Sequence, residues 1–204
     1  VVKSGVFGVI RVGGFVFGPE LMRQCGFNTL LVFFAGTTII LASLLAFRQD
    51  NLKHRLAYST IGHLSYIVLG AALLSPASLI GGLMHMANHA TMKITLFFCA
   101  GAIYVRHHKE KISELDGIGR VMPWTMGAFT VGAIGLAGIP PLSGFFGKLY
   151  VFSAAVHAHQ YGLVVVGVLL SALSLYYYLR VIVAMYMQEE TAPPVDAGAS
   201  TPLT

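Results

Sequence analysis

Three basic side chains at regular four-residue spacing lie in the middle of a long apolar stretch of this sequence. His85, His89 and Lys93 fall within residues 78–105, SLIGGLMHMANHATMKITLFFCAGAIYV, which contain no acidic group. In an α-helix, positions i, i+4 and i+8 share one face, because each residue turns the chain by about 100°. Imidazole and amine groups in such a file can take up and release protons in turn.

The surroundings of this file favour a functional role over a packing role. A run this long and apolar is typical of a membrane-spanning helix. An ionisable side chain at the bilayer centre costs about 3 kcal/mol or more unless it faces protein or water. One buried, hydrogen-bonded histidine would explain His85 or His89 alone, but not three basic groups on one face. The spacing therefore predicts a row of polar side chains on a helix face that lies inside the protein.

A second feature is an apolar stretch with a break beside a charge. Residues 121–156 are too long for one straight span and are interrupted at Gly138, Pro140 and Pro141. Proline lacks an N–H and clashes with the preceding turn, so carbonyls before the break lose their helical partners. At membrane depth, such a break is tolerated only where protein or water satisfies those carbonyls. Broken helices beside a charge, here Lys148, are typical of ion pathways in transporters.

The ionisable groups expected inside the membrane are all basic or neutral. They are Lys3, His63, His85, His89, Lys93 and Lys148. All eight acidic residues fall outside the expected spans. Burial disfavours the charged form of a lysine, and histidine titrates close to neutrality. Joined by hydroxyls and ordered water, these groups would form a relay that carries one proton at a time.

Two kinds of cofactor site are weaker interpretations of the same residues. The spacing of His85 and His89 suits zinc, but no Glu or Cys stands beside them and Lys93 is a poor neighbour for a cation. We predict no metal site. A haem held by His63 and one of these histidines is a less favoured alternative. Without a phosphate loop, nucleophile triad or paired carboxylates, the sequence predicts neither an enzyme active site nor a cofactor.

The elements that position these groups are predicted to form an all-α, polytopic transmembrane helix bundle. Of 204 residues, 56% are hydrophobic and 10% charged, against about 25% charged in soluble domains. Residues 1–17 are expected to be a truncated span, residues 18–26 a loop and residues 188–204 a flexible tail. Between them, residues 27–187 are expected to hold five segments: 27–47, 56–74, 78–105, 121–156 and 162–187.

Smaller features of the sequence have ordinary membrane explanations. Tyr176, Tyr177, Tyr178 and Arg180 are expected in an aromatic belt at one membrane surface. Two isolated cysteines predict no disulfide framework. We interpret the net charge of +5 from the positions of the charged residues along the chain and not as evidence of a nucleic-acid-binding surface. No nucleic-acid partner is therefore expected.

The distribution of Lys and Arg over alternate loops predicts the orientation. The loops at 48–55 and 106–120 carry seven: Arg48, Lys53, Arg55, Arg106, Lys109, Lys111 and Arg120. The opposite side carries Arg23 alone. Because positive loops stay in the cytoplasm, we expect both of these loops on the cytoplasmic side of an inner (cytoplasmic) membrane.

Four stretches resemble the motifs of one family of membrane subunits. Residues 50–66, DNLKHRLAYSTIGHLSY, resemble its D-x-K-R-x-x-A-Y-S-S/T-I-x-H signature, and residues 85–93 its H-x-x-x-H-A-x-x-K helix. Residues 136–148, LAGIPPLSGFFGK, resemble its L-A-G-I-P-P-x-x-G-F-x-x-K broken helix, and residues 115–120 its linking loop. This is the antiporter-like subunit family of respiratory complex I (NADH:quinone oxidoreductase), Mrp-type Na⁺/H⁺ antiporters and membrane-bound hydrogenases.

The resemblance implies a larger bundle of two inverted repeats, each with one broken helix. This chain would hold the end of the first repeat and nearly all of the second. It places Lys3 at the repeat junction, His85, His89 and Lys93 in the central relay and Lys148 at the outward exit. The glutamate–lysine pair of the first repeat is not in this sequence. The family subunit type also has no redox ligands of its own.

These observations together predict a proton-translocating, antiporter-like membrane subunit. Its partners would be other membrane subunits of a complex, the lipid bilayer and H⁺, with Na⁺ as an alternative exchanged ion. A different class of function is a non-conducting structural membrane module of such a complex. A haem-binding membrane subunit is the third alternative.

Overall fold

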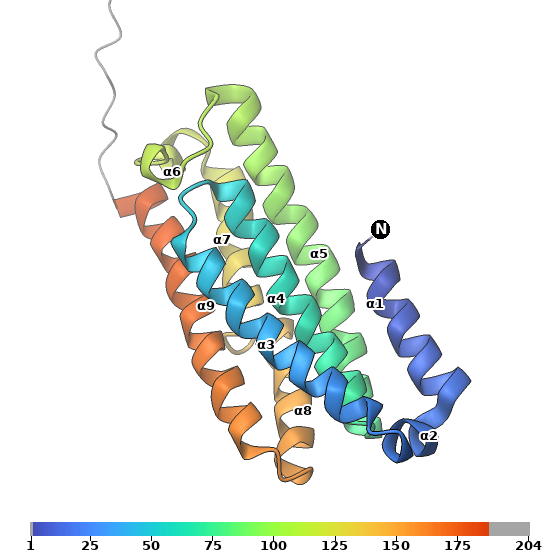
Figure 1. Ribbon diagram of the computed structural model, residues 1–204. Helices are drawn as coiled ribbons and strands as arrows, with labels where there is room; N and C mark the ends of the chain where they lie inside the picture. The colour runs from blue at the N-terminus through green and yellow to red at the C-terminus, as the bar shows by residue number, and fades with distance from the viewer. Residues whose placement is uncertain (1, 188–204) are drawn as a thin grey trace, which may run out of the picture.

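The computed structural model describes residues 2–187, and all its regular elements are helices (Figure 1). The tail expected at 188–204 lies outside the described residues. In chain order the elements are α1 (Val2–Arg11), the π-helical η1 (Val12–Phe17), α2 (Gly18–Gln24), α3 (Phe27–Arg48), α4 (Leu52–Ala72), α5 (Pro76–His107), the 3₁₀ turn η2 (Ile112–Glu114), α6 (Ile118–Val121), α7 (Pro123–Ala137), α8 (Ser143–His157) and α9 (Tyr161–Met187).

Residues 18–26 are expected to form a loop, but most of them are helical in the structure. Pro19 occupies the first turn of α2, where its missing N–H is not needed. The change of direction is made by Gly18, whose φ of 74° is open to glycine. Pro19 therefore begins a short helix, and the turn into α3 falls at Gly26 (φ 65°).

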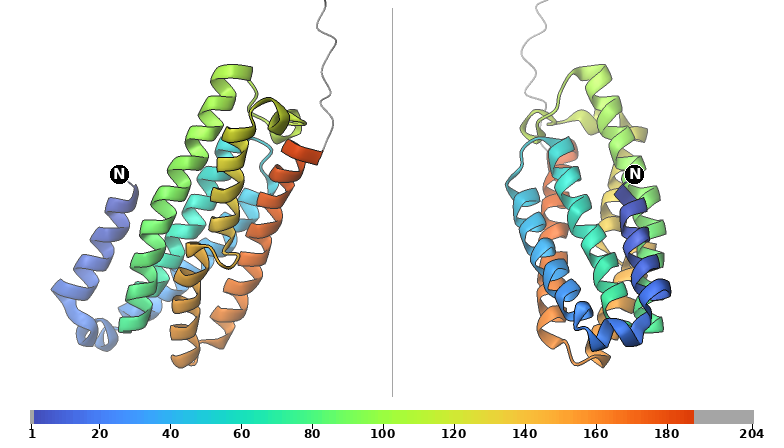
Figure 2. Two further views of the ribbon diagram at one scale, coloured as in Figure 1. Left: turned by 180° about the vertical axis from the view of Figure 1, so that it is seen from behind. Right: turned by 45° about the vertical axis from the view of Figure 1, so that its right-hand side comes forward.

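The bundle is arranged around α4 and α5, which pack against each other (Figures 1 and 2). Helix α3 lies along α4 and α9, while α5 also contacts α7 and α8. Helix α1 stands at the outside of the bundle beside α5, and its packing in the bundle is mainly against α4 (Figure 2). Candidate site residues on α4 and α5 therefore lie inside the bundle.

The broken segment consists of α7 and α8, with residues 138–142 between them. Each half has 15 residues and is therefore about 22 Å long. Neither half alone can cross a hydrocarbon layer of about 30 Å. Placed end to end, the two halves are long enough, and their non-helical junction falls within the bundle (Figure 1).

Among residues 2–187, three helical segments are long and apolar enough to span a membrane by themselves: Val2–Gln24, Phe27–Arg48 and Tyr161–Met187. The long helices α4 and α5 are less apolar because each carries buried polar groups such as His63 and Lys93. These buried polar side chains face other helices and not the outside of the bundle. Large apolar side chains such as Phe98, 74% exposed, cover the outward face of α5.

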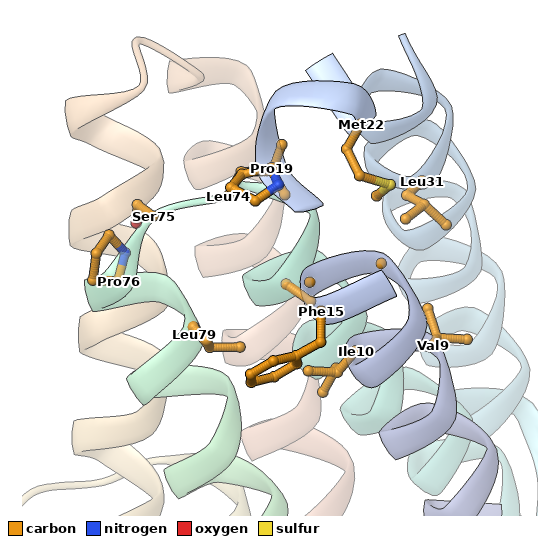
Figure 3. A pocket seen from close by; sticks show the side chains of 13 residues that line it. Val9, Ile10, Phe15, Pro19, Met22, Leu31, Leu74, Ser75, Pro76 and Leu79 are labelled. Carbon is orange, nitrogen blue, oxygen red and sulfur yellow. The ribbon is translucent and has the colours of Figure 1, made fainter. Parts of the chain in front are cut away.

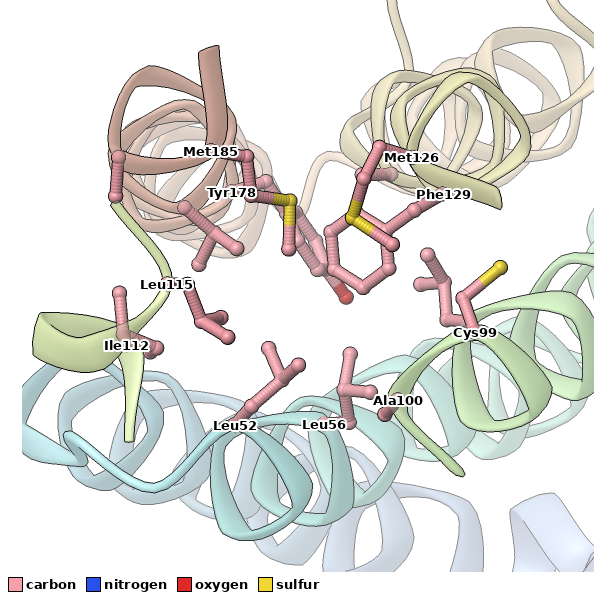
Figure 4. Packing of buried hydrophobic residues seen from close by; sticks show 14 of the residues in the cluster. Leu52, Leu56, Cys99, Ala100, Ile112, Leu115, Met126, Phe129, Tyr178 and Met185 are labelled. Carbon is pink, nitrogen blue, oxygen red and sulfur yellow. The ribbon is translucent and has the colours of Figure 1, made fainter. Parts of the chain in front are cut away.

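The largest apolar core lies at the end of the bundle that holds α6. Figure 4 shows side chains from α4, α5, α7 and α9 meeting there. The loop after α5 closes this end by inserting Ile112 and Leu115, both buried. Backbone hydrogen bonds from Ile112 N to Asp50 O (2.8 Å) and from Leu52 N to Glu110 O (2.9 Å) join this loop to the α3–α4 turn. The loops at 48–55 and 106–120 thus form one surface.

Candidate functional site

Three buried histidines form a cluster between α4 and α5. His63 Nδ1 lies 3.3 Å from His85 Nε2, within hydrogen-bonding distance. The ring centroids of His63 and His89 are 5.4 Å apart, and those of His85 and His89 are 6.2 Å apart. All three side chains are at most 3% exposed. The spacing of His85 and His89 on one helix and the position of His63 on the next therefore bring imidazole groups together.

Lys93 lies in a polar site built by three helices. Its Nζ donates to Leu56 O (2.8 Å) and to Ser59 Oγ on α4. The same ammonium lies 3.3 Å from the Tyr178 hydroxyl on α9, and that hydroxyl donates to Ser59 Oγ at 3.1 Å. These three oxygen atoms accept the hydrogen bonds of a lysine that is only 3% exposed.

Lys148 lies at the break between α7 and α8. Its Nζ donates to Ala137 O at 3.0 Å, a carbonyl at the C-terminal end of α7, where a positive charge is favoured. The Asn88 side chain on α5 donates to Ser143 O on the other half at 3.0 Å. The backbone N–H of Gly138 bonds to Gly135 O and Ile134 O. Protein groups thus replace the helical partners that the break removes.

Lys3 lies across an open cavity from the Lys93 site. The cavity has a volume of about 330 Å³, and its lining includes Lys3, Thr60, His89 and Lys93. It connects the N-terminal end of α1 with the polar groups of α4 and α5. The structure therefore places all six predicted residues in one region of the bundle, in the order Lys3, Lys93, the histidine cluster and Lys148.

Close packing of small residues holds α8 against α5. A methyl group at Gly147 would come within 3.1–3.2 Å of the His85 backbone and Cβ, and one at Gly81 within 2.7 Å of Tyr150 Cβ. Glycine at these positions allows the helices to approach until Lys148 and His85 lie on facing surfaces. This contact therefore helps to set the distance between Lys148 and the histidines of α5.

Two tyrosines of the site were assigned the wrong environment from sequence. Tyr177 and Tyr178 were expected in an interfacial belt, but they are 2% and 1% exposed. Tyr176, at 56%, faces outward as expected. The signal was the helical spacing of α9, because Ser174, Tyr178, Val181 and Met185 share its buried face. Tyr66, whose ring lies 5.7 Å from Lys148 Nζ, was also missed.

The described residues offer bases and hydroxyls to a proton but no cluster of ligands to a metal. Among residues 2–187, no three His, Cys, Asp or Glu side chains are placed to hold one ion. A separate cavity of about 270 Å³ lies at the elbow of η1 and α2, where Ile10, Phe15 and Leu79 line it (Figure 3). Its walls are almost wholly apolar, so it offers no route for protons.

Comparison with known proteins places this geometry in a family. A family profile described as NADH:quinone oxidoreductase/Mrp antiporter, TM, matches residues 1–174. NADH-quinone oxidoreductase subunit N 1 of Rhizobium meliloti (strain 1021) is 40% identical over 162 residues, which are 78% of this chain and 34% of that protein. The chain spans about a third of the length of the curated relatives it matches.

Two solved structures share the arrangement of helices. A chain of the Mrp complex from a Dietzia species superposes with a TM-score of 0.85 at 29% identity, over 93% of this chain and 35% of that one. A chain of respiratory complex I from Thermus thermophilus superposes with a TM-score of 0.83 at 26% identity, over 93% and 40%. The predicted all-α membrane fold and the predicted resemblance are confirmed, and the chain belongs to the NADH:quinone oxidoreductase/Mrp antiporter transmembrane family.

Proposed function

We propose that this chain is part of a proton-translocating, antiporter-like membrane subunit. The observation that carries the proposal is a series of buried basic groups and hydroxyls on α4, α5, α8 and α9, of which several neighbours lie within hydrogen-bonding distance. Lys93 and Lys148 lie at its two ends within the bundle, and His63, His85 and His89 lie between them. The family profile that the chain matches is described as NADH:quinone oxidoreductase/Mrp antiporter, TM, and a similar curated protein is named NADH-quinone oxidoreductase subunit N 1.

The proposed path begins at Lys3 and ends beyond Lys148. A proton would pass from the cavity beside Lys3 to Lys93, then through the histidine cluster to Lys148. Each proton moved against 100 mV costs about 2.3 kcal/mol, a scale that repulsion between neighbouring ammonium groups can supply in a low-dielectric interior. Since the cluster contains no carboxylate, it favours one excess proton at a time.

The surrounding assembly is also part of the proposal. The chain would supply the second of two inverted repeats, with residues 1–17 at the junction, inside a complex of membrane subunits. It would lie in an inner (cytoplasmic) membrane with the loops at 48–55 and 106–120 in the cytoplasm. The transported ion is H⁺, and Na⁺ is the ion that an antiporter of this type would exchange for it.

Replacement of the two buried lysines tests the function. Lys93→Met and Lys148→Met keep most of the side-chain volume but remove the proton-carrying amine. We expect each variant, in the intact complex in membrane vesicles, to lower coupled proton uptake by about 100-fold. Lys111→Met, on an exposed loop, is the control. Normal uptake by either buried variant, measured with a pH-sensitive dye, would contradict the proposed path.

A structural role is the second candidate, because each ammonium also satisfies a helix carbonyl. Lys93 binds Leu56 O and Lys148 binds Ala137 O. If the lysines serve only this purpose, the methionine variants will lower the thermal stability or the amount of assembled complex. Under the proposed function, assembly persists and proton uptake is lost.

A further inference from the structure

One aromatic side chain lies between the histidine cluster and Lys148. The ring of Tyr66, on α4, is centred 6.4 Å from the centre of the His63 ring and 6.3 Å from that of the His85 ring. The Lys148 ammonium lies over the same ring, 5.7 Å from its centre. Tyr66 is 5% exposed. This buried side chain therefore adjoins groups on both sides of the proposed step from the histidines to Lys148.

The Lys148 ammonium has few polar neighbours among the described residues. One hydrogen bond there, to Ala137 O at 3.0 Å, uses one of its three N–H donors. No ion pair in that part of the chain includes Lys148. The whole residue is only 5% exposed. A positive charge on this nitrogen therefore depends on weaker partners, and the face of an aromatic ring within about 6 Å is such a partner.

The Tyr66 ring is held in one orientation by α8 and α9. Its hydroxyl donates to Gly167 O on α9 at 3.0 Å, and Ser171 Oγ lies 3.5 Å from the same hydroxyl. Phe152, one helical turn after Lys148 on α8, meets the ring edge-on at 70°, with the two ring centres 6.0 Å apart. A methyl group at Gly167 would come within 2.6 Å of the Phe152 ring, so glycine there lets α9 approach both aromatic residues.

We propose that Tyr66 is a positioning residue whose ring stabilises the protonated form of Lys148 beside the histidine cluster. This inference rests on the proposed function and adds a residue to its last step. The negative face of an aromatic ring attracts a cation, and the removal of water strengthens the attraction. For a desolvated pair, the effect on an equilibrium is about tenfold or more. The ring itself carries no proton and undergoes no chemical change.

The hydroxyl of Tyr66 has a different role from the ring. Within residues 2–187 its hydrogen bonds go to α9 only, and none reaches a histidine or Lys148. A group that carries the proton would need to lie within hydrogen-bonding distance of its donor and its acceptor. We therefore assign the interaction with Lys148 to the ring, and we assign to the hydroxyl the task of holding the ring in place.

Aromatic side chains that differ in charge distribution but little in shape test the role of the ring. Proton uptake is measured in the intact complex in membrane vesicles and expressed per assembled complex. Tyr66→Phe keeps the ring and should keep most of the uptake. Pentafluorophenylalanine at position 66 has nearly the shape of phenylalanine, but its fluorine atoms withdraw electrons from the face of the ring. Uptake should then fall by about tenfold relative to Tyr66→Phe.

Pentafluorophenylalanine at position 146 is the matched control. Phe146 lies on α8 two residues before Lys148 and is 44% exposed, so its ring faces away from the site and uptake should stay normal. Tyr66→Leu removes the ring altogether and should lower uptake at least as far as pentafluorophenylalanine at position 66. The Tm of the fluorinated complex should match that of Tyr66→Phe, because a change in charge distribution leaves the packing of the ring in place.

The possible results separate three claims. Equal uptake by the Tyr66→Phe complex and the complex with pentafluorophenylalanine at position 66 would overturn the role of the ring. A loss with Tyr66→Phe as large as that with Tyr66→Leu would also overturn it, since the hydroxyl would then be the essential group. Normal uptake by Lys148→Met would instead overturn the proposed function, whatever the variants of Tyr66 do.

Discussion

The charged side chains of this bundle bind backbone groups more often than acidic partners. Arg55, 2% exposed, donates to Gln49 O and Tyr177 O, much as Lys93 and Lys148 bind carbonyls within the bundle. A neutral carbonyl stabilises an ammonium less than a carboxylate does, so a lysine held in this way can give up its proton more readily. A buried carboxylate partner would fix the charge in place.

The ion pair between Lys53, in the first turn of α4, and Glu110, in the loop after α5, shows the opposite arrangement. Lys53 Nζ donates to Glu110 Oε1 at 2.9 Å and lies 3.9 Å from the centre of the Tyr104 ring. Asn51 Nδ2 donates to the other carboxylate oxygen at 3.2 Å. The hydrogen bond from the Lys53 ammonium is the main cause that lowers the pKa of Glu110. This carboxylate joins the two loops.

The lowered pKa of Glu110 predicts a dependence of stability on pH. The folded protein binds the carboxylate proton less tightly than the unfolded chain, so the contribution is complete above the usual glutamate pKa of about 4.3. It is lost as pH falls through the lower folded value. We expect Glu110→Gln to reduce the fall in Tm of the purified protein over this acidic range.

The control for this measurement is Glu20→Gln, since Glu20 is exposed on α2 and forms no ion pair among residues 2–187. Its acid dependence should match that of the native protein. If Glu110→Gln has the same Tm profile as native protein below the usual glutamate pKa, the pair contributes nothing to folding.

At the scale of elements, the contact between α5 and α8 determines how Lys148 lies relative to the histidines of α5. Three glycines on these two helices, Gly81, Gly144 and Gly147, have too little room for a methyl group. At Gly144, the added carbon would clash with Gly135 O of α7. The two halves of the broken helix and α5 therefore approach one another as far as backbone contact allows.

Gly147→Ala is expected to destabilise the bundle by about 1–3 kcal/mol, because the methyl can be accommodated only by moving backbone. The added carbon would lie 3.2 Å from His85 Cα and N, so α5 and α8 must separate. Thermal unfolding in detergent, followed by circular dichroism, measures the change.

Gly101→Ala on the neighbouring helix α5 is the control for this substitution. A methyl there meets no atom within 4 Å, and its greater helix propensity should leave Tm unchanged or slightly higher. Equal Tm values for Gly147→Ala and Gly101→Ala would show that α5 and α8 do not depend on this close approach.

At the scale of the whole molecule, the two ends of the bundle differ in their polar surface. The loops at 48–55 and 106–120, joined by Lys53 and Glu110, lie together at one end (Figure 1). The α2–α3 turn, with the exposed Cys25, lies at the other end. Whatever the orientation in the membrane, these two surfaces must face opposite compartments.

Thiol labelling of intact cells tests the orientation proposed from the positive loops. A membrane-impermeant maleimide should label Cys25 from outside, while the buried Cys99 stays unlabelled. In a Cys25→Ser background, Ser113→Cys, at an exposed position of the loop after α5, should react only after the membrane is opened. Labelling of Ser113→Cys in intact cells would reverse the proposed orientation.

The sequence by itself determined the class of fold and the residue types at its centre. Apolar runs of 20 residues or more imply membrane helices because only helices satisfy their own backbone in lipid. Helical periodicity then placed His85, His89 and Lys93 on one face, and proline chemistry located the break near Pro140. These inferences depend on local helix geometry, which follows directly from the order of residues in the chain.

Only the tertiary structure decided which groups meet. Periodicity within α9 does not state which neighbour its buried face touches, so Tyr178 was assigned to the membrane surface although it contacts Lys93. The meeting of His63 with His85 and the hydrogen bond from Lys93 to Leu56 O likewise depend on how separate helices pack. Pairing across helices is set by the fit of small residues such as Gly147 against a backbone, which no local pattern records.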